Sequence, residues 1–206
     1  MKISGSPTSP ESPLALSGRE PFARGTKRHC YVHPDDPDLC VKVAVRDDAD
    51  CLRQQRWDLE DNRRLRARGD SVFDCIPAIE GVVDTDLGRG IVMRLCRDHD
   101  GRISRNLSQV IREHGLTPSL VRAIDALKRW LRKERLLTMD TAPYNVVAVR
   151  LDGGDWKLMI IEGWENRRYR WLASLHPLVK DRLIARQLRK FDRRVSCVAE
   201  ASQGIS

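Results

Sequence analysis

Asp140 and Asn145 are the residues of this sequence whose types and spacing most clearly indicate chemistry. They lie five positions apart between two apolar runs, at residues 136–137 and 146–149. Protein kinases use an Asp and an Asn at this spacing, the Asp to accept the proton of the acceptor hydroxyl and the Asn to bind Mg²⁺. Pro143 restricts the turn between them. The pattern predicts phosphoryl transfer, and the alternative is a turn closed by an Asx cap.

Upstream, residues 22–34 include a glycine and two cations that could face phosphate groups. Gly25 would let the backbone approach a nucleotide phosphate, and Lys27 and Arg28 add positive charge. A kinase glycine loop normally has three glycines, whereas this segment has Gly25 alone. We therefore keep two interpretations, a loop that covers the phosphates of ATP and a basic hairpin turn.

Lys42 is the single charged residue in the apolar run at residues 39–45. In a buried strand its ammonium group would need a counter-charge, because an unpaired buried charge is costly. The alternative is an edge strand from which the lysine reaches solvent. A partner could come from residues 51–68, which have the composition of an exposed helix. We expect Glu60 to pair with Lys42, and Asp58 is the alternative.

Residues 76–95 have the pattern of two strands joined by a turn at residues 84–90. The second strand would lead into a hinge at residues 96–102. In that arrangement Met93 and Leu95 would border the adenine ring of ATP, and the alternative is an ordinary strand end. Further along, residues 146–151 and 156–161 flank a turn and predict a hairpin that ends at Glu162.

Glu162 would be the second metal ligand of such a site. Kinases have the Asp of the D-F-G motif at this place, whereas this chain has Glu162, Gly163 and Trp164. A glutamate offers the same carboxylate on a longer stem. Glu162 can therefore bind Mg²⁺, but its longer stem shifts the position of the carboxylate, and Mg²⁺ requires nearly ideal octahedral geometry.

Helices are expected between and after these motifs. Residues 107–114 form a first helix, and residues 118–135 form a second, with Thr117 as its cap and Pro118 in its first turn. Residues 167–194 carry many Lys and Arg side chains interleaved with apolar ones. This segment predicts an amphipathic basic helix, or a pair of helices broken at Pro177.

With these parts in this order, the chain resembles the YrbL family, which is associated with the PhoP regulatory network and classed as protein-kinase-like. The segments that carry the resemblance are RGTKRHCYVHPDD, LCVKV, IPAIEGVV and LLTMDTAPYNVVAV. The resemblance implies an α+β fold of two lobes. We expect an antiparallel sheet lobe with one helix at residues 19–95 and a helical lobe at residues 96–195, with ATP and Mg²⁺ in the cleft.

Several residues depart from the wider kinase pattern. Thr138 and Met139 replace the His and Arg that usually precede the catalytic Asp, and Ala142 stands where protein kinases usually have a Lys. Few residues follow Trp164, so no platform for a peptide substrate is expected. The acceptor would be the hydroxyl of a small molecule or a glycolipid. The alternative is an inactive pseudokinase that acts through a regulatory protein partner.

The ends of the chain and its overall composition complete these expectations. Residues 1–18 are rich in Ser, Pro and Gly and predict a disordered leader, and residues 196–206 predict a disordered tail. No segment approaches the roughly twenty apolar residues of a membrane span. The six cysteines show no C-x-x-C pair, which indicates reduced thiols and a cytoplasmic location. The net charge of +8 favours, as an alternative function, a regulator that binds nucleic acid through the basic C-terminal helices.

Overall fold

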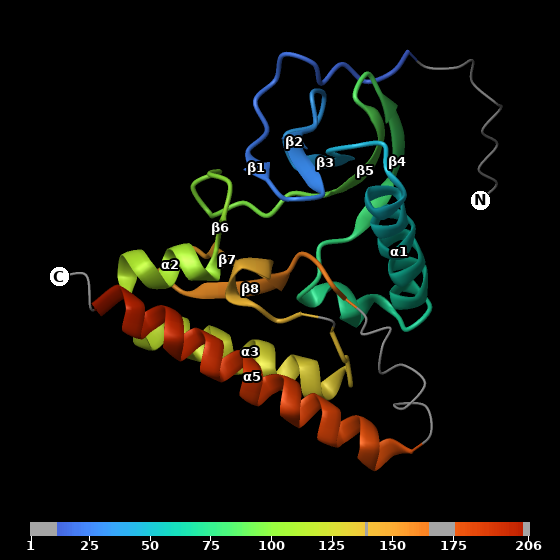
Figure 1. Cartoon of the computed structure of the whole chain (residues 1–206). Helices are drawn as coiled ribbons and strands as arrows, with labels where there is room; N and C mark the ends of the chain where they lie inside the picture. The colour runs from blue at the N-terminus through green and yellow to red at the C-terminus, as the bar shows by residue number, and fades with distance from the viewer. Residues whose placement is uncertain (1–11, 139, 165–175, 204–206) are drawn as a thin grey trace, which may run out of the picture. The chain divides into compact units, whose positions relative to one another are not determined.

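The computed structural model describes residues 12–138, 140–164 and 176–203. Strands and helices are both present, so the predicted α+β class is confirmed (Figure 1). The elements, in chain order, are β1 (Ala23–Arg24), β2 (Arg28–Val32), β3 (Leu39–Ala44), α1 (Ala49–Arg66), the 3₁₀ turn η1 (Asp70–Asp74), β4 (Ile79–Thr85), β5 (Gly88–Arg94), β6 (Arg105–Asn106), α2 (Leu107–His114), α3 (Pro118–Lys133), the 3₁₀ turn η2 (Pro143–Asn145), β7 (Val146–Arg150), β8 (Trp156–Ile160) and α5 (Pro177–Gln203).

The chain divides into two compact units. The first unit contains Met1–Gln55 and Ile79–Met93, and the second contains Arg56–Ala78 and Arg94–Ser206. The division falls after Met93, and the lobe boundary predicted from the sequence lies after residue 95. Arg56–Ala78, however, belongs to the second unit, whereas the sequence assigned it to the first lobe. Two hydrogen bonds hold it there, from Trp130 Nε1 to the Ser71 carbonyl oxygen (3.2 Å) and from Ile160 N to the Cys75 carbonyl oxygen (2.8 Å).

The first unit is built on a five-stranded sheet in the order β1-β2-β3-β5-β4. The pairs β1–β2, β2–β3 and β4–β5 are antiparallel, as predicted. β3 is the central strand of this sheet. Its apolar side chains join those of neighbouring strands in a core that contains Leu16, Tyr31, Val41, Val43 and Val92. Burial of such side chains is the main source of stability for a sheet of this kind.

The prediction of a disordered leader through residue 18 is wrong for its last residues. Leu14 forms a parallel bridge with Thr85, and Leu16 is fully buried in the core of the first unit. Asp86 fixes the turn that follows, because its Oδ1 accepts a hydrogen bond from Leu16 N (2.8 Å) and its Oδ2 accepts one from Ser17 N (3.0 Å). These bonds, that of Leu16 first, lower the pKa of Asp86. The sequence of this segment has few apolar residues, but Leu14 and Leu16 are enough to anchor its last part.

The second unit contains a three-stranded antiparallel sheet in the order β6-β7-β8 and the helices α2, α3 and α5. The predicted helices at residues 107–114 and 118–135 correspond to α2 and α3. Asn106 caps α2 in a reciprocal capping box with Gln109, and Thr117 caps α3 as predicted. α5 contacts both α2 and α3 and runs beside α3 in Figure 1. The buried stripe of α3 therefore faces a second helix as well as β8.

α5 corrects the prediction that residues 196–206 form a disordered tail, since the helix continues to Gln203. Val195 is buried and Val198 is partly buried, so the apolar stripe extends past the predicted end. Ala and Glu residues in this last part also favour helix. The basic helix predicted after residue 167 begins at Pro177 in the described part of the chain. The first part of the predicted segment, residues 167–175, lies outside the described residues.

Candidate functional site

Asp140 lies in the loop between α3 and η2, and its two carboxylate oxygens have different partners. Oδ1 accepts a hydrogen bond from Ala142 N (3.1 Å) and an ion-paired hydrogen bond from the guanidinium of Arg194. Oδ2 accepts a hydrogen bond from the hydroxyl of Tyr144 (3.3 Å). The contact with Ala142 N is an Asx turn, so the structural alternative predicted from the sequence is present. An Asx turn through Oδ1 leaves Oδ2 able to accept a proton from a hydroxyl group.

The hydroxyl of Tyr144 donates to Asp140 Oδ2 and so holds one oxygen of this carboxylate. The negative charge of Asp140 raises the pKa of Tyr144, and partial burial and the hydrogen bond to Asp140 act in the same direction, while Arg194 opposes them. The phenol is therefore held as a proton donor toward Oδ2. Tyr144 is itself 58% exposed, so the side chain can leave Oδ2 without breaking a packed core.

Asn145 and Glu162 are brought to the same end of one hairpin. β7 begins directly after Asn145 and pairs with β8, with Val146 opposite Ile160. The pairing continues one step beyond the strands, because Ile161 N donates to the carbonyl oxygen of Asn145 (3.1 Å). Glu162 is the next residue along the chain, and both side chains are partly exposed. The predicted hairpin therefore places Glu162 close to Asn145, which is the last residue of the Asp140 loop (residues 138–145).

α5 holds the Asp140 loop at two points that the sequence did not indicate. Gln187 Oε1 accepts a hydrogen bond from Thr138 N (3.0 Å), and Arg194 pairs with Asp140. The two α5 residues are seven positions apart, which is about two helical turns and places them on one face. They lie beside the buried stripe that includes Phe191. An amphipathic pattern identifies such a stripe, but it does not reveal which polar neighbours contact a distant loop.

Lys42 is buried in the first unit, with 6% of its surface exposed. It lies on β3 opposite Cys30 of β2. Because β3 has β2 on one side and β5 on the other, the alternative of a lysine on an edge strand is wrong. A buried ammonium at this place requires compensation by polar or negatively charged groups. The role of Lys42 in binding phosphates stays a prediction.

The two carboxylates predicted as partners of Lys42 differ in exposure. Glu60 is partly exposed and forms an i,i+4 ion pair with Arg64 on α1. Asp58 is 5% exposed. Both belong to the second unit and Lys42 belongs to the first. The pairing of Lys42 with Glu60, or with Asp58, therefore stays a prediction.

Gly25 lies in the turn of the β1–β2 hairpin. Gly25 N donates to the carbonyl oxygen of Arg28 (2.8 Å), and a Cβ at this position would lie 3.0 Å from that oxygen. The turn thus has a steric reason to contain glycine. Residues 25–27 are exposed. A basic hairpin turn is present, and its use as a phosphate-covering loop is untested.

Met93 and Leu95, predicted to border adenine, lie at the end of β5 and just after it. Met93 is 2% exposed and pairs with Ile79 of β4, while Leu95 is partly buried. The division between the two units falls between them. Their contact with a nucleotide stays a prediction.

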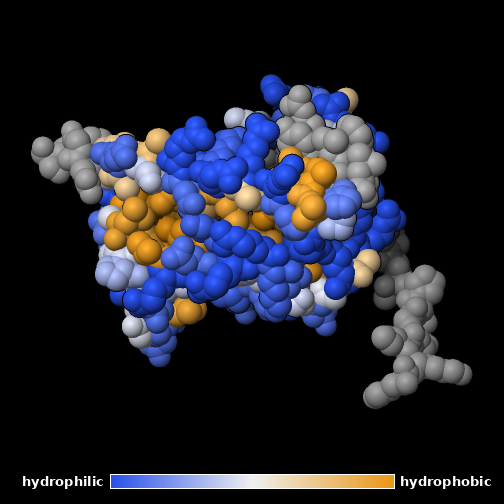
Figure 2. Space-filling view, turned by 90° about the horizontal axis from the view of Figure 1, so that it is seen from below, coloured by the Kyte–Doolittle hydropathy of each residue, from blue (hydrophilic) through white to orange (hydrophobic). Residues whose placement is uncertain are grey.

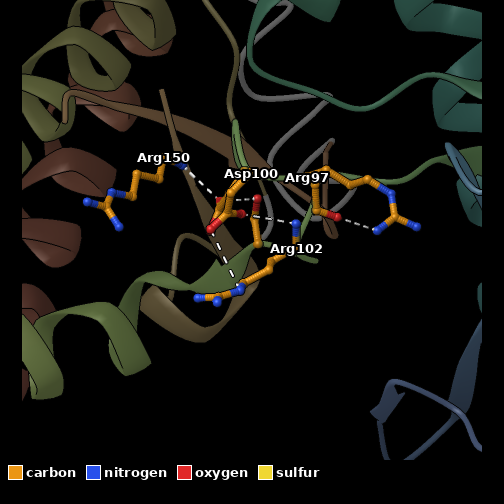
Figure 3. Close-up of polar contacts among 7 residues, drawn as sticks. Arg97, Asp100, Arg102 and Arg150 are labelled. Atoms are coloured by element: carbon orange, nitrogen blue, oxygen red, sulfur yellow. Dashed lines mark hydrogen bonds and ion pairs between the residues drawn. The ribbon is translucent and has the colours of Figure 1, made fainter. Parts of the chain in front are cut away.

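The predicted hinge at residues 96–102 is part of a tight hairpin closed by a bridge between Arg97 and Ile103. Figure 3 shows its contacts: Arg97 reaches back to the Gly101 carbonyl oxygen (2.7 Å) and Arg102 N donates to Asp100 Oδ1 (3.1 Å). The latter bond lowers the pKa of Asp100.

This hairpin is also tied to β7. Asp98 Oδ1 accepts hydrogen bonds from Ser104 Oγ (2.6 Å) and from Arg150 N (2.9 Å), and His99 N donates to the Arg150 carbonyl oxygen (2.9 Å). In Figure 3 the side chain of Arg150 points away from the other residues drawn. The segment is therefore held within the second unit by these contacts, and its role as a hinge between two lobes stays a prediction.

Two wider features of the described residues bear on function. No group of three or more His, Cys, Asp and Glu side chains within the described ranges is arranged to hold a metal ion. Among the helices described, none combines the length and the apolar character needed to cross a membrane.

Comparisons with known proteins give a family and two relatives. The family model described as PhoP regulatory network protein YrbL matches residues 14–196. Two proteins, each called "Uncharacterized protein YrbL", from Escherichia coli (strain K12) and from Shigella flexneri, are 28% identical to this chain over 145 residues, which covers 67% of this chain and 67% of each relative.

One solved structure that resembles this chain is the crystal structure of a kinase domain, at 16% sequence identity and a TM-score of 0.49. The match covers 69% of this chain and 48% of the other, so this chain spans about half the length of that kinase domain.

Proposed function

This chain belongs to the family of PhoP regulatory network protein YrbL, and from that premise we propose that it binds ATP with Mg²⁺ and transfers the γ-phosphoryl group to a hydroxyl of a small molecule or a glycolipid. The observation that supports this most is the Asp140 carboxylate. Its Oδ2 already accepts a hydrogen bond from a hydroxyl group, that of Tyr144. A carboxylate with this contact can orient an acceptor hydroxyl and take up its proton.

The order of elements gives a second line of support. A hairpin turn with Gly25 precedes a central strand with Lys42, a helix with Asp58 and Glu60 follows, and the Asp140 loop and the hairpin that ends at Glu162 come later. Phosphoryl-transfer sites of the protein-kinase type use these parts in this order. We assign Lys42 to the α- and β-phosphates, Gly25 to the loop that covers them, Met93 and Leu95 to adenine, and Glu60 or Asp58 to the orientation of Lys42.

The donor groups fit magnesium. Asn145 and Glu162 offer an amide oxygen and a carboxylate at one end of the β7–β8 hairpin. Mg²⁺ prefers such hard oxygen ligands and is commonly held by one or two carboxylates together with substrate phosphates. When bound, the ion would neutralise negative charge on the phosphates. Asn145 and Glu162 would hold it, and Asp140 would orient the acceptor hydroxyl beside it.

The proposal is tested first by nucleotide binding. Thermal unfolding of the full chain is measured with and without ATP and Mg²⁺. A ligand at about a hundred times its dissociation constant stabilises by about 2.7 kcal/mol, which raises the melting temperature by several degrees for a chain of this size. Lys42→Met should remove most of this shift, while Lys157→Met, which replaces an exposed lysine on β8, should retain it. A wild-type chain without any shift would refute nucleotide binding.

Turnover is tested with Asp140→Asn. This substitution keeps the size of the side chain and removes its capacity to accept a proton. If the chain is a kinase, phosphoryl transfer should fall by about a hundredfold or more, and ATP binding should persist. Acceptors are supplied by a cell extract and transfer is followed with labelled ATP. A wild-type chain that binds ATP but shows no transfer would support the alternative of an inactive pseudokinase.

A second candidate function, the binding of nucleic acid, is supported by exposed arginines on α5. α5 exposes Arg182, Arg186, Arg189 and Arg193 at steps of three and four residues, which forms one basic stripe on the helix. Such a stripe can bind the phosphates of nucleic acid. Binding of ATP and binding of nucleic acid are measured separately, so the two functions are distinguishable.

A further inference from the structure

Residues 138–145, which form the Asp140 loop, contain no Lys or Arg. Phosphoryl transfer develops negative charge on the transferred group, and catalysis depends on cations placed to stabilise that charge. If the loop itself supplies none, a cation near Asp140 has to come from elsewhere in the chain. The structure provides one, because the guanidinium of Arg194 on α5 contacts Asp140 Oδ1.

The chemistry of Arg194 suits a second, anionic partner. A guanidinium has five N–H donors in a planar fork, which matches the geometry of phosphate oxygens. In the described part of the chain Asp140 is the acceptor found for Arg194, through Nη1. The Arg194 side chain is 33% exposed. Donors beyond the one used by Asp140 can therefore reach a ligand from the solvent side.

Arg194 is also well fixed. The neighbouring residues Phe191 and Val195 are buried, and Asp192 forms an ion pair with Lys128 of α3 (2.7 Å). Gln187, two turns earlier on α5, holds the backbone of Thr138 in the same loop. A cation that is held in place before the substrate arrives needs little reorganisation when negative charge develops on the transferred phosphoryl group. This preorganisation is the condition for electrostatic stabilisation.

We propose that Arg194 binds the γ-phosphate of ATP while its hydrogen bond to Asp140 Oδ1 keeps Oδ2 directed at the acceptor hydroxyl. Arg194 is then both a phosphate-binding residue and a positioning residue for Asp140. This inference rests on the proposed function and deepens it, since it names the group that discriminates a triphosphate from a diphosphate.

The test compares the affinities of ATP and ADP, each with Mg²⁺, by titration calorimetry of the full chain. Arg194→Ala should weaken ATP binding by about tenfold or more, as expected for a lost charge-assisted contact, and should change ADP binding by less than about twofold. Arg194→Lys should recover part of the ATP affinity. The matched control Arg193→Ala removes the same charge from the next, exposed residue and should change neither affinity.

A second variant guards against a change in folding. Asp140→Asn leaves Arg194 in place and removes its anionic partner, so this variant should bind ATP at least as tightly as the wild type does. If the ion pair is merely structural, Arg194→Ala and Asp140→Asn should each lose ATP affinity and ADP affinity equally. An unchanged ratio of ATP to ADP affinity in Arg194→Ala, with ATP binding by the wild type intact, overturns this inference alone. A wild type that binds neither nucleotide overturns the proposed function and this inference together.

Discussion

Asp140, the proposed base, has different partners at each of its two carboxylate oxygens. The carboxylate has two oxygens, and the protein engages them differently: Ala142 N and Arg194 contact Oδ1, and Tyr144 contacts Oδ2. In the proposed reaction, an acceptor hydroxyl would replace the Tyr144 hydroxyl before a proton passes to Oδ2. Because Tyr144 is largely exposed, this exchange costs little packing.

Cys75 gives a prediction at the same scale. Burial raises the pKa of its thiol to about 11, although Lys157 opposes the shift. The reactive species of a cysteine is the thiolate, so at pH 8 Cys75 should react with iodoacetamide far more slowly than the exposed Cys197. The rate for Cys75 should rise as the pH approaches 11. Timed alkylation followed by peptide mass spectrometry measures both rates in one sample, and equal rates at pH 8 would contradict the prediction.

The residues predicted from the sequence were those with a local signature. Asp140 and Asn145 share a short loop, and the hairpin that delivers Glu162 follows from two apolar runs around a turn. Arg194 and Gln187 had no such signature. Their contacts with the loop depend on how α5 packs in the second unit, and one basic side chain on a basic helix looks like any other in the sequence. The sequence left open both a buried Lys42 and a Lys42 on an edge strand, and only the order of the strands decides between them.

At the scale of elements, Gly90 on β5 shows how closely two strands approach. A Cβ at Gly90 would lie 2.5 Å from Val41 Cγ1 on β3, a separation that real atoms do not reach without movement. Gly90→Ala should therefore destabilise the chain by about 1–3 kcal/mol through overpacking. Urea unfolding measures the change.

Gly81→Ala is the matched control on the partner strand β4, because nothing lies within 4 Å of a Cβ at Gly81. This variant should change the free energy of unfolding by less than about 1 kcal/mol. Equal losses for Gly81→Ala and Gly90→Ala would show that the close approach to Val41 does not govern stability.

Elements with strong local patterns were predicted well, and chain ends were not. The Thr117 cap and the apolar stripe predicted α3, and turn residues predicted the β4–β5 and β7–β8 hairpins. The segment around Leu16 looked disordered because its composition is polar, yet one buried leucine and the Asp86 carboxylate anchor it. Composition averages over a segment, whereas docking depends on a single side chain and one acceptor at the right place.

At the scale of the whole molecule, net charge and its distribution decide which ligands are attracted. The chain carries a net charge of +8. Figure 2 shows the face seen from below in Figure 1, where hydrophilic residues border a strip of apolar ones. The exposed arginines of α5 contribute to the positive field of the second unit.

The nucleic-acid function makes a quantitative prediction. If Arg186, Arg189 and Arg193 each neutralise one phosphate, replacing all three by Gln should reduce the slope of log affinity against log salt by about 2–3. Fluorescence anisotropy with a labelled single-stranded RNA and a labelled DNA duplex, at several salt concentrations, gives this slope.

The matched control replaces Arg53, Arg56 and Arg63, which are exposed on α1. Both triple variants lower the net charge equally. If α5 binds the nucleic acid, only the α5 variant should show a reduced slope of log affinity against log salt. An equal reduction for both variants would indicate attraction by net charge alone, and an absence of binding by the wild type would remove this function.

The two contacts from α5 to the Asp140 loop have a consequence for biosynthesis. Asp140 leaves the ribosome more than fifty residues before Arg194, and Thr138 almost fifty before Gln187. At about 5–20 residues per second, a nascent chain spends several seconds with this loop already made but lacking both of its tethers. A nascent chain is thus unable to adopt the mature arrangement of the Asp140 carboxylate until about two thirds of α5, through Arg194, has been synthesised.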